Sequence, residues 1–406
     1  MDEQEAITKA QALLNRQGEV AVSPLAVYRH ASKADSVQQG RPNVVLIMME
    51  SMSSKLMKHF GQSETLTPFL DSLYTRSISF RNFYSAGIHT NHGLYATLYS
   101  FPAMMKRNLM KGSVIPRYSG LPTVLKENGY YNLFFMTHEG QYDNMNAFFR
   151  TNGYDEVFSQ EDYPVDKVVN SFGVQDDFLY DYAIPVLNQR AATGQPFFAT
   201  LLSISNHPPY VIPPFFHPKT SEPEMQIVEY ADWALRQFFE EARKQPWFDN
   251  TIFVLEGDHG KLVGDAECEL PESYNHIPLM IYSSRIQPEE KTAFGGQVDI
   301  QPTILGLLNI DYLQNNFGVD LLKEERPCMF YTADNMVVGR NDTLLYLYNY
   351  ETQQELTYDI GNGKLNAVPM DDSFFPLKEY SFSMLQSAEF LVKHGKTLNS
   401  IPFTQQ

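Results

Sequence analysis

Short apolar segments alternate with amphipathic stretches along the first three quarters of the chain. Apolar runs typical of strands buried on both faces of a parallel sheet occur at residues 43–49, 196–205, 251–258 and 277–284. Two further segments with strand character lie at 78–85 and 130–138. Apolar positions at helical spacing occur between them, at 66–77, 91–100, 121–129, 172–189 and 224–244. This alternation predicts an α/β fold, a three-layer sandwich around a mainly parallel central sheet.

The two ends of the chain differ from this pattern. Residues 3–16 fit a short amphipathic helix, and we assign 1–41 to an N-terminal helix and linker. The alternating α/β pattern defines a domain at 42–310. Beyond it, β-alternation with turn residues and a final helical stretch predict a small C-terminal α+β subdomain at 311–406, with antiparallel strands and a closing helix.

Composition and charge restrict the class of partner. Hydrophobic residues make up 43% of the 406 positions, which is ample for a folded core. The formal charge of −17 repels nucleic acid, so we expect no nucleic-acid partner. An anionic substrate would need local positive charge, which a bound divalent cation would supply. Acidic charge that only maintains solubility is an equally good explanation for most of these residues.

The sequence leaves the compartment open. No apolar run reaches the about 18 residues that a membrane span requires, and the polar N-terminus is unlike a secretory signal. The chain is therefore either cytoplasmic or a piece of a longer protein. Cys268 and Cys328 allow one disulfide, but their spacing does not show whether they are close.

Polar side chains follow three of the predicted buried strands. Glu50 comes directly after 43–49, His207 follows 196–205, and Asp258 with His259 ends the run TIFVLEGD. Ligands of open parallel sheets bind at the carboxyl ends of strands, and carboxylates with imidazole suit a divalent metal. Taken singly, each residue has an ordinary explanation as a helix cap, a turn residue or a loop histidine.

Thr90 is the candidate nucleophile. It lies in SAGIHTNHGLYATL, between a predicted strand and a predicted helix. The exposed amides and dipole of a helix N-terminus favour a phosphate, and metal coordination would lower the pKa of the hydroxyl. The alternative is that Thr90 is simply the N-cap of the helix.

Eight segments occur in an order that indicates a family: NVVLIMMES, LTPFLDSLYTRSISFRNFYSAGIHTNHG, LFFMTHEGQYDNMNAFFRTNGYDEVF, LSISNHPPY, VLEGDHGK, HIPLMIYS, VDIQPTILGLLNI and NNFGVDLL. Together they resemble the alkaline phosphatase and sulfatase superfamily over about residues 42–325. Within it they look most like the lipoteichoic acid synthase and phosphoglycerol transferase branch. The resemblance implies that 42–310 is a sulfatase-like catalytic domain.

The resemblance also implies a catalytic centre. One divalent cation is expected, Mn²⁺ first, with Zn²⁺, Mg²⁺ or Ca²⁺ as alternatives. Thr90 would attack the phosphorus of a phospholipid headgroup and form a phosphothreonine, which an acceptor hydroxyl or water would resolve. The implied metal ligands are Glu50, Thr90, Asp258 and His259. The implied substrate-binding residues are His207, His138 and His276.

Two departures from the family pattern bear on the substrate. The formylglycine sulfatases need Cys or Ser followed by x-Pro-x-Arg at the nucleophile, whereas Thr90 is followed by Asn-His-Gly. Lipoteichoic acid synthases carry a phosphate-binding arginine near residue 142, where this chain has Tyr142-Asp143-Asn144. The first departure makes formylglycine chemistry improbable, and the second weakens the case for a phosphoglycerol headgroup.

Three functions therefore compete. The leading one is a metal-dependent phosphoryl-group transferase that acts on a phospholipid headgroup, with a glycan or polyol acceptor. The second is a phosphodiesterase, phosphonate or sulfate-ester hydrolase on the same scaffold, and the third is a non-catalytic binding or sensing domain. Because members of this branch are usually extracytoplasmic, we expect the same location here. Membrane association would then come through segments absent from this chain.

Overall fold

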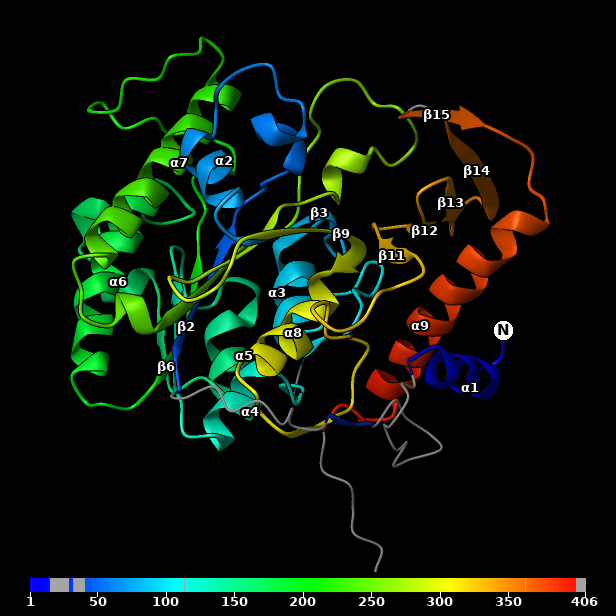
Figure 1. The fold of residues 1–406 in the computed structure, drawn as a ribbon, viewed down its shortest axis with the longest axis horizontal. Helices are drawn as coiled ribbons and strands as arrows, with labels where there is room; N and C mark the ends of the chain where they lie inside the picture. Colours follow the sequence, from blue (N-terminus) through cyan, green and yellow to red (C-terminus); the bar gives the residue numbers. More distant parts are fainter. Residues whose placement is uncertain (15–28, 32–40, 113, 362, 399–406) are drawn as a thin grey trace, which may run out of the picture.

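The structure, a computed structural model, describes residues 1–14, 29–31, 41–112, 114–361 and 363–398. An eight-stranded sheet with the order β5-β4-β6-β2-β7-β8-β3-β9 runs through its centre (Figure 1). The first five strands are parallel, β8 runs antiparallel to both neighbours, and β3 and β9 are parallel. The strands are β2 (Asn43–Met49), β3 (Ile78–Tyr84), β4 (Tyr131–Met136), β5 (Glu156–Phe158), β6 (Phe197–Leu202), β7 (Thr251–Gly257), β8 (Leu279–Tyr282) and β9 (Glu289–Gly296).

Helices cover both faces of this sheet, which confirms the predicted three-layer α/β sandwich. Alternate residues of β2 show why two cores form: Val44, Leu46 and Met48 point into one core, and Val45 and Ile47 into the other. The first core includes α3 (Thr90–Tyr99), α4 (Leu121–Glu127), α5 (Met145–Thr151) and α8 (Ile300–Leu307). The second includes α2 (Pro68–Tyr74), α6 (Asp176–Ala191) and α7 (Pro223–Ala242).

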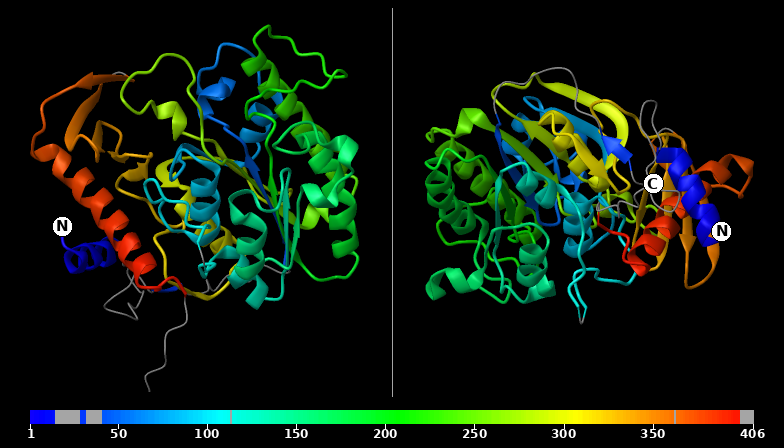
Figure 2. Two further views of the ribbon diagram at one scale, coloured as in Figure 1. Left: turned by 180° about the vertical axis from the view of Figure 1, so that it is seen from behind. Right: turned by 90° about the horizontal axis from the view of Figure 1, so that it is seen from below.

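The C-terminal part forms the predicted antiparallel subdomain. Its five strands pair in chain order, and α9 (Phe375–Lys393) packs against β11 and β12. The helix α1 (Glu3–Leu14) lies beside α9, as Figure 2 shows, and is joined to it by ion pairs such as Lys393–Glu3 at 3.0 Å. The strands are β11 (Met329–Thr332), β12 (Met336–Arg340), β13 (Leu344–Asn349), β14 (Gln354–Gly361) and β15 (Lys364–Ala367).

Only part of the predicted N-terminal linker lies within the described residues. There, β1 (Arg29–Ala31) pairs antiparallel with β10 (Tyr312–Gln314), so one short piece of this segment is a strand. Residues 17–28 and 32–40 of the predicted linker lie outside the described residues. So do residues 15 and 16, the last two of the helix predicted at 3–16.

Two questions that the sequence left open concern the cysteines and the membrane. Cys268 and Cys328 are free thiols, and Cys328 is buried. Within the described parts of the chain, no helix combines the length and the apolar character that crossing a bilayer requires.

A buried ion pair joins the α/β domain to the C-terminal subdomain. Arg326 and Asp299 are both fully shielded from solvent, and Nε of Arg326 donates to both carboxylate oxygens at 2.9 and 3.1 Å. Nη1 of Arg326 also donates to the hydroxyl of Tyr380 on α9, at 2.6 Å. Asp299 accepts further hydrogen bonds from the backbone amides of Gly296, at the end of β9, and Val319, at 3.0 and 2.8 Å. The pair therefore connects α8 with α9 through one guanidinium.

We predict that Arg326→Met lowers the free energy of unfolding by about 3–5 kcal/mol, because it leaves the carboxylate of Asp299 buried without its cation. Urea unfolding followed by circular dichroism measures the change. Arg243→Met is the matched control, since Arg243 is exposed and makes only a distant contact with the ring of Phe248. A loss for Arg326→Met no larger than the control's would show that the pair contributes little to stability.

Candidate metal centre

The register of two parallel strands brings the first two candidate ligands together. β2 and β7 pair from Asn43 with Thr251 to Met49 with Gly257, so Glu50 and Asp258 are the next residues on each strand. The amide of Asp258 donates to the carbonyl of Met49 at 3.0 Å, which continues the ladder by one step. Both carboxylates therefore leave the carboxyl edge of the sheet at the same level.

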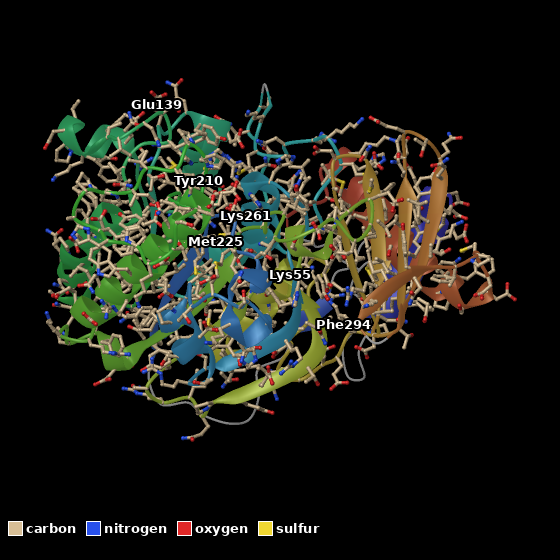
Figure 3. All side chains as sticks on the ribbon, turned by 90° about the horizontal axis from the view of Figure 1, so that it is seen from above. Lys55, Glu139, Tyr210, Met225, Lys261 and Phe294 are labelled. Carbon is tan, nitrogen blue, oxygen red and sulfur yellow. The ribbon has the colours of Figure 1, made fainter. Side chains whose placement is uncertain are left out.

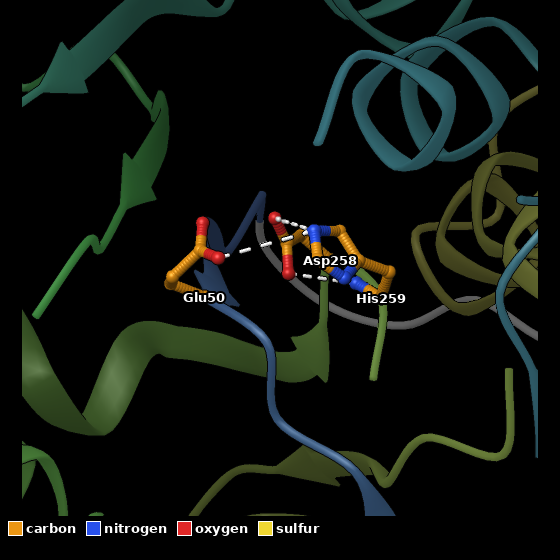
Figure 4. A group of neighbouring side chains, drawn as sticks. All are labelled: Glu50, Asp258 and His259. Atoms are coloured by element: carbon orange, nitrogen blue, oxygen red, sulfur yellow. Dashed lines mark hydrogen bonds and ion pairs between the residues drawn. The ribbon is translucent and has the colours of Figure 1, made fainter. Parts of the chain in front are cut away.

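His259 completes a three-residue cluster with them, shown in Figure 4. Its Nε2 lies 3.6 Å from Oδ2 of Asp258 and 3.9 Å from Oε1 of Glu50. One ligand atom from each residue falls within 4.8 Å of the other two. Glu50 and Asp258 are almost completely buried, whereas the side chain of His259 is 13% exposed. The cluster thus opens to solvent on the imidazole side.

Hydrogen bonds fix the orientation of the carboxylates. Ser51 donates its hydroxyl to Oε1 of Glu50 at 2.6 Å and its amide to Oδ1 of Asp258 at 2.8 Å. The amide of His259 also donates to Oδ1 of Asp258, at 2.7 Å. Oδ2 of Asp258 is buried and has no hydrogen-bond partner among the described residues. A buried carboxylate oxygen without a donor is costly, and a cation would satisfy it.

The tautomer of His259 fits the same role. Its Nδ1 lies 2.7 Å from the carbonyl oxygen of Gly260, and that oxygen can only accept a hydrogen bond. The proton therefore resides on Nδ1, and Nε2 offers its lone pair toward the carboxylates. Two carboxylates and a neutral imidazole are a suitable ligand set for Mn²⁺, Zn²⁺ or a similar divalent ion.

The electrostatics of Glu50 also favour a cation. Burial raises the pKa of Glu50 well above its ordinary value, and the neighbouring charge of Asp258 raises it further. Without a cation, the protonated form of Glu50 is therefore favoured over two adjacent negative charges. A divalent ion would reverse both effects and favour the ionised form.

Thr90 reaches the same cluster from α3. It is the first residue of the helix, after His89 as N-cap, so the N-cap interpretation of Thr90 does not describe the structure. Its hydroxyl donates a long hydrogen bond of 3.4 Å to Oε2 of Glu50. Gly93 permits this approach, because a Cβ at that position would lie 2.2 Å from the carbonyl oxygen of Asp258.

Two of the three predicted substrate-binding histidines lie in one aromatic cluster. His138 follows β4 and is buried, and its ring centroid is 4.5 Å from that of Tyr142. His207 follows β6, with its ring centroid 4.0 Å from that of Phe172. Tyr142 and Phe172 contact each other at 6.3 Å and so connect the two histidines. Burial lowers the pKa of His138 to about 4, which keeps it neutral at pH 7.

His276 is the third predicted substrate-binding histidine, and it has different neighbours. Its ring stacks on Tyr84 at 5.1 Å, and its Nε2 donates to the carbonyl of Arg81 at 2.7 Å. Its Nδ1 faces Glu272 at 3.9 Å. These contacts belong to a polar network behind the loop that follows β7, and none of them involves a candidate metal ligand. A role for His276 in substrate binding stays a prediction without geometric support.

Lys261 and Asn206 are site residues that the sequence reasoning missed. Nζ of Lys261 donates to Oδ1 of Asn206 at 2.7 Å, and Nδ2 of Asn206 donates to the carbonyls of Glu50 and Ser51. Lys261 also lies over the ring of Tyr210, and Figure 3 shows the two side chains close together on this face. Burial lowers the pKa of Lys261 to about 8. Both residues lie inside segments already singled out, EGDHGK and SNHPPY, so those segments were the available signal.

Comparison with known proteins shows the family to which the chain belongs. Residues 42–310 match the family model described as Sulfatase. Lipoteichoic acid synthase 2 of Bacillus subtilis is 25% identical over 315 residues, which are 70% of this chain and 47% of the relative. Lipoteichoic acid synthase of Staphylococcus aureus is 24% identical over 327 residues, covering 70% of this chain and 48% of the relative. The chain thus spans about half the length of the curated relatives it matches.

Solved structures share the fold over most of the chain. A protein of the alkaline phosphatase superfamily from Vibrio parahaemolyticus superposes with a TM-score of 0.87 at 25% identity, over 98% of this chain and 97% of that one. The lipoteichoic acid synthase LtaP of Listeria monocytogenes gives a TM-score of 0.74 at 21% identity, over 87% of this chain and 92% of that one. With a family model that covers most of its length, the chain belongs to the sulfatase family of the alkaline phosphatase superfamily.

Proposed function

We propose that this chain is a metal-dependent phosphoryl-group transferase that acts on a phospholipid headgroup through a phosphothreonine at Thr90. The observation that carries the proposal is the position of the Thr90 hydroxyl, 3.4 Å from Glu50 and beside the cluster with Asp258 and His259. Relatives named lipoteichoic acid synthases support a phosphoglycerol-transferring reaction as the leading candidate.

Four side chains would hold the cation: Glu50, Asp258, His259 and Thr90. Mn²⁺ is our first candidate, and one ion is sufficient for the ligands that the structure brings together. Bound there, it would neutralise charge on the phosphoryl oxygens and lower the pKa of the Thr90 hydroxyl. Thr90 is the first residue of α3, and the positive end of the helix dipole there would favour the phosphoryl group.

The reaction of the protein's own groups has two halves. In the first, Oγ1 of Thr90 forms a bond to phosphorus while the bond from phosphorus to the lipid glycerol oxygen breaks. Oε2 of Glu50 is positioned to accept the proton of Thr90, and diacylglycerol leaves after gaining a proton. In the second half, an acceptor hydroxyl attacks the same phosphorus, the bond to Oγ1 breaks, and Thr90 regains a proton. Water in place of the acceptor would make the enzyme a hydrolase.

Binding and location complete the proposal. His207 and His138, joined by the aromatic side chains between them, would contact the headgroup. A glycan or a polyol is the proposed acceptor. We further propose that the domain works on the outer side of the cytoplasmic membrane, where its lipid substrate would be reached through segments absent from this chain.

For the nucleophile, we predict that Thr90→Ala abolishes turnover because the variant has no oxygen at position 90 to form the bond to phosphorus. The measurement is the intact protein mass after incubation with Mn²⁺ and phosphatidylglycerol, beside assay of released diacylglycerol. Wild type should gain a phosphoglycerol-sized increment that Thr90→Ala lacks. The variant's free energy of unfolding should change by less than about 0.5 kcal/mol, since the side chain is partly exposed.

Thr90→Ser is the matched variant for this experiment, because it keeps a hydroxyl at the same position and should retain the adduct. Diacylglycerol release by Thr90→Ala at the wild-type rate would exclude the covalent mechanism. Repeating the wild-type reaction with and without an added glycan or polyol acceptor distinguishes a transferase from a hydrolase, since only the former should depend on the acceptor.

For the metal, we predict that Glu50→Gln and Asp258→Asn each weaken Mn²⁺ binding by about 100-fold or more, because each removes an anionic ligand. Isothermal titration calorimetry of the apo protein gives the affinity. Since the pKa of Glu50 is raised in the metal-free protein, Mn²⁺ must displace a proton there. Affinity should therefore increase with pH, by up to about tenfold per pH unit below that raised pKa, and level off above it.

Glu267→Gln is the control for this titration. Glu267 pairs with Lys55 at 3.0 Å and takes no part in the cluster, so its loss should leave Mn²⁺ affinity unchanged. An affinity that is the same in wild type, Glu50→Gln and Asp258→Asn would show that the cation binds elsewhere.

A further inference from the structure

A groove beside the catalytic centre remains outside the proposed reaction. It is a cavity of about 410 Å³ between the start of α2, the loop around Phe216–Lys219 and the middle of α7. We call it the α2–α7 groove. Its lining combines apolar and aromatic side chains, including Leu66 and Phe69, with three basic side chains. This volume lies within the range of small-molecule sites in proteins.

Both acidic side chains of the groove are already occupied by backbone donors. Glu229 accepts hydrogen bonds from the amides of Lys219 and Thr220, each at 2.9 Å, and from the Thr220 hydroxyl at 2.6 Å. Asp232 accepts from the amides of Phe69 and Leu70 at the start of α2, each at 2.9 Å. These two carboxylates are buried and serve to fix the loop and the helix. Their hydrogen bonds are satisfied by the backbone, although the charge of Asp232 still acts on Arg236.

The basic side chains of the groove make few ion pairs with the described residues. The ammonium of Lys219 and the ring of His217 make no ion pair with any residue that the structure describes, and both residues are exposed. Arg236 makes only a long pair with Glu240, at 3.8 Å, in which both side chains are about half exposed. Glu229 and Asp232 line the groove too, but their hydrogen bonds are taken by backbone donors. The donors of Lys219 and Arg236 therefore stay available to an anionic group in the groove.

Aromatic rings form the other part of the wall. The rings of Trp233 and Phe216 both line the groove, and their centroids lie 5.7 Å apart. Flat aromatic faces beside hydrogen-bonding cations suit the C–H faces of a sugar or polyol that also bears an anionic group.

The groove is a close neighbour of the metal centre. Asp232 lines both the α2–α7 groove and a second, very small cavity, which is also lined by Glu50 and Asn206. One layer of side chains therefore separates the groove from the candidate metal ligand Glu50. A ligand held in the groove would lie beside the catalytic centre without contacting the metal cluster.

We propose that the α2–α7 groove is a binding site for a phosphorylated sugar or polyol, with Lys219 and Arg236 contacting the phosphate and Trp233 the carbon skeleton. The recess fits a ligand of one or two sugar units, whereas a membrane surface would require a protruding apolar face. Because a layer of side chains separates the groove from Glu50, we propose it as a separate binding site and not as the site of the reacting acceptor hydroxyl. Binding does not depend on the proposed transferase function, because no residue of the groove is a metal or nucleophile candidate.

Tryptophan fluorescence provides a local test, since the chain has only two tryptophans and the other, Trp247, is buried away from the groove. In Trp247→Phe, treated with a chelator so that the metal centre does not contribute, Trp233 is the sole reporter. Titration with glucose 6-phosphate should give a saturable fluorescence change, and unphosphorylated glucose should bind at least about tenfold more weakly. Calorimetry of the unmodified protein repeats the measurement without the Trp247 substitution.

Charge removal then tests the contacts. Lys219→Gln combined with Arg236→Gln should weaken glucose 6-phosphate binding by at least about tenfold, because two cations are lost. Arg243→Gln combined with Lys244→Gln is the matched control, since it removes two cations just beyond the C-terminal end of α7 and should leave binding unchanged.

Three results would overturn the proposal. One is the absence of any saturable signal by either method, and another is equal binding by the Lys219/Arg236 variant and wild type. The third is a Trp233 response to phosphatidylglycerol vesicles but not to glucose 6-phosphate, which would make the groove a membrane contact. Failure of the Thr90 adduct experiment would refute the proposed function and leave these binding results unaffected.

Discussion

The parallel pairing of β2 with β7 is the constraint on which the candidate site depends. Because the two strands run in register to Met49 and Gly257, Glu50 and Asp258 emerge at the same edge of the sheet. Ser51 then donates to both carboxylates at once. A shift of one residue in this pairing would turn one of the carboxylates toward a helix layer and separate the two.

This placement has an electrostatic cost. Two buried carboxylates lie side by side, with one oxygen of Asp258 lacking any donor among the described residues. Proteins tolerate such strain at functional sites because the surrounding structure enforces it. Here the enforcing elements are the sheet itself and α3, which approaches so closely that position 93 has no room for a side chain. The arrangement is consistent with a cation-binding role and gives little benefit to folding alone.

The C-terminal subdomain supports the loop that follows His259. Arg340, at the end of β12, pairs with Glu272 of that loop at 2.7 Å, and Tyr84 donates to the same carboxylate at 3.0 Å. His276 lies in this network, stacked on Tyr84. His276, which the family resemblance associates with substrate binding, therefore has mainly structural contacts. The subdomain and the α/β domain share one buried polar network on this side, and the Arg326–Asp299 pair joins them on another.

The sequence alone determined the layers of the fold and the edge of the sheet at which the candidate metal ligands lie. Six consecutive apolar residues in β2, Val44 to Met49, require burial on both faces, and residues that follow such strands must lie at one edge of a parallel sheet. Periodicity does not encode which strands are neighbours. Long-range packing produces four features of the structure: the antiparallel direction of β8, the placement of His276 away from the metal ligands, the contact of Lys261 with Asn206, and the α2–α7 groove. Tertiary structure decided them, because each depends on side chains distant in sequence that only the folded chain brings together.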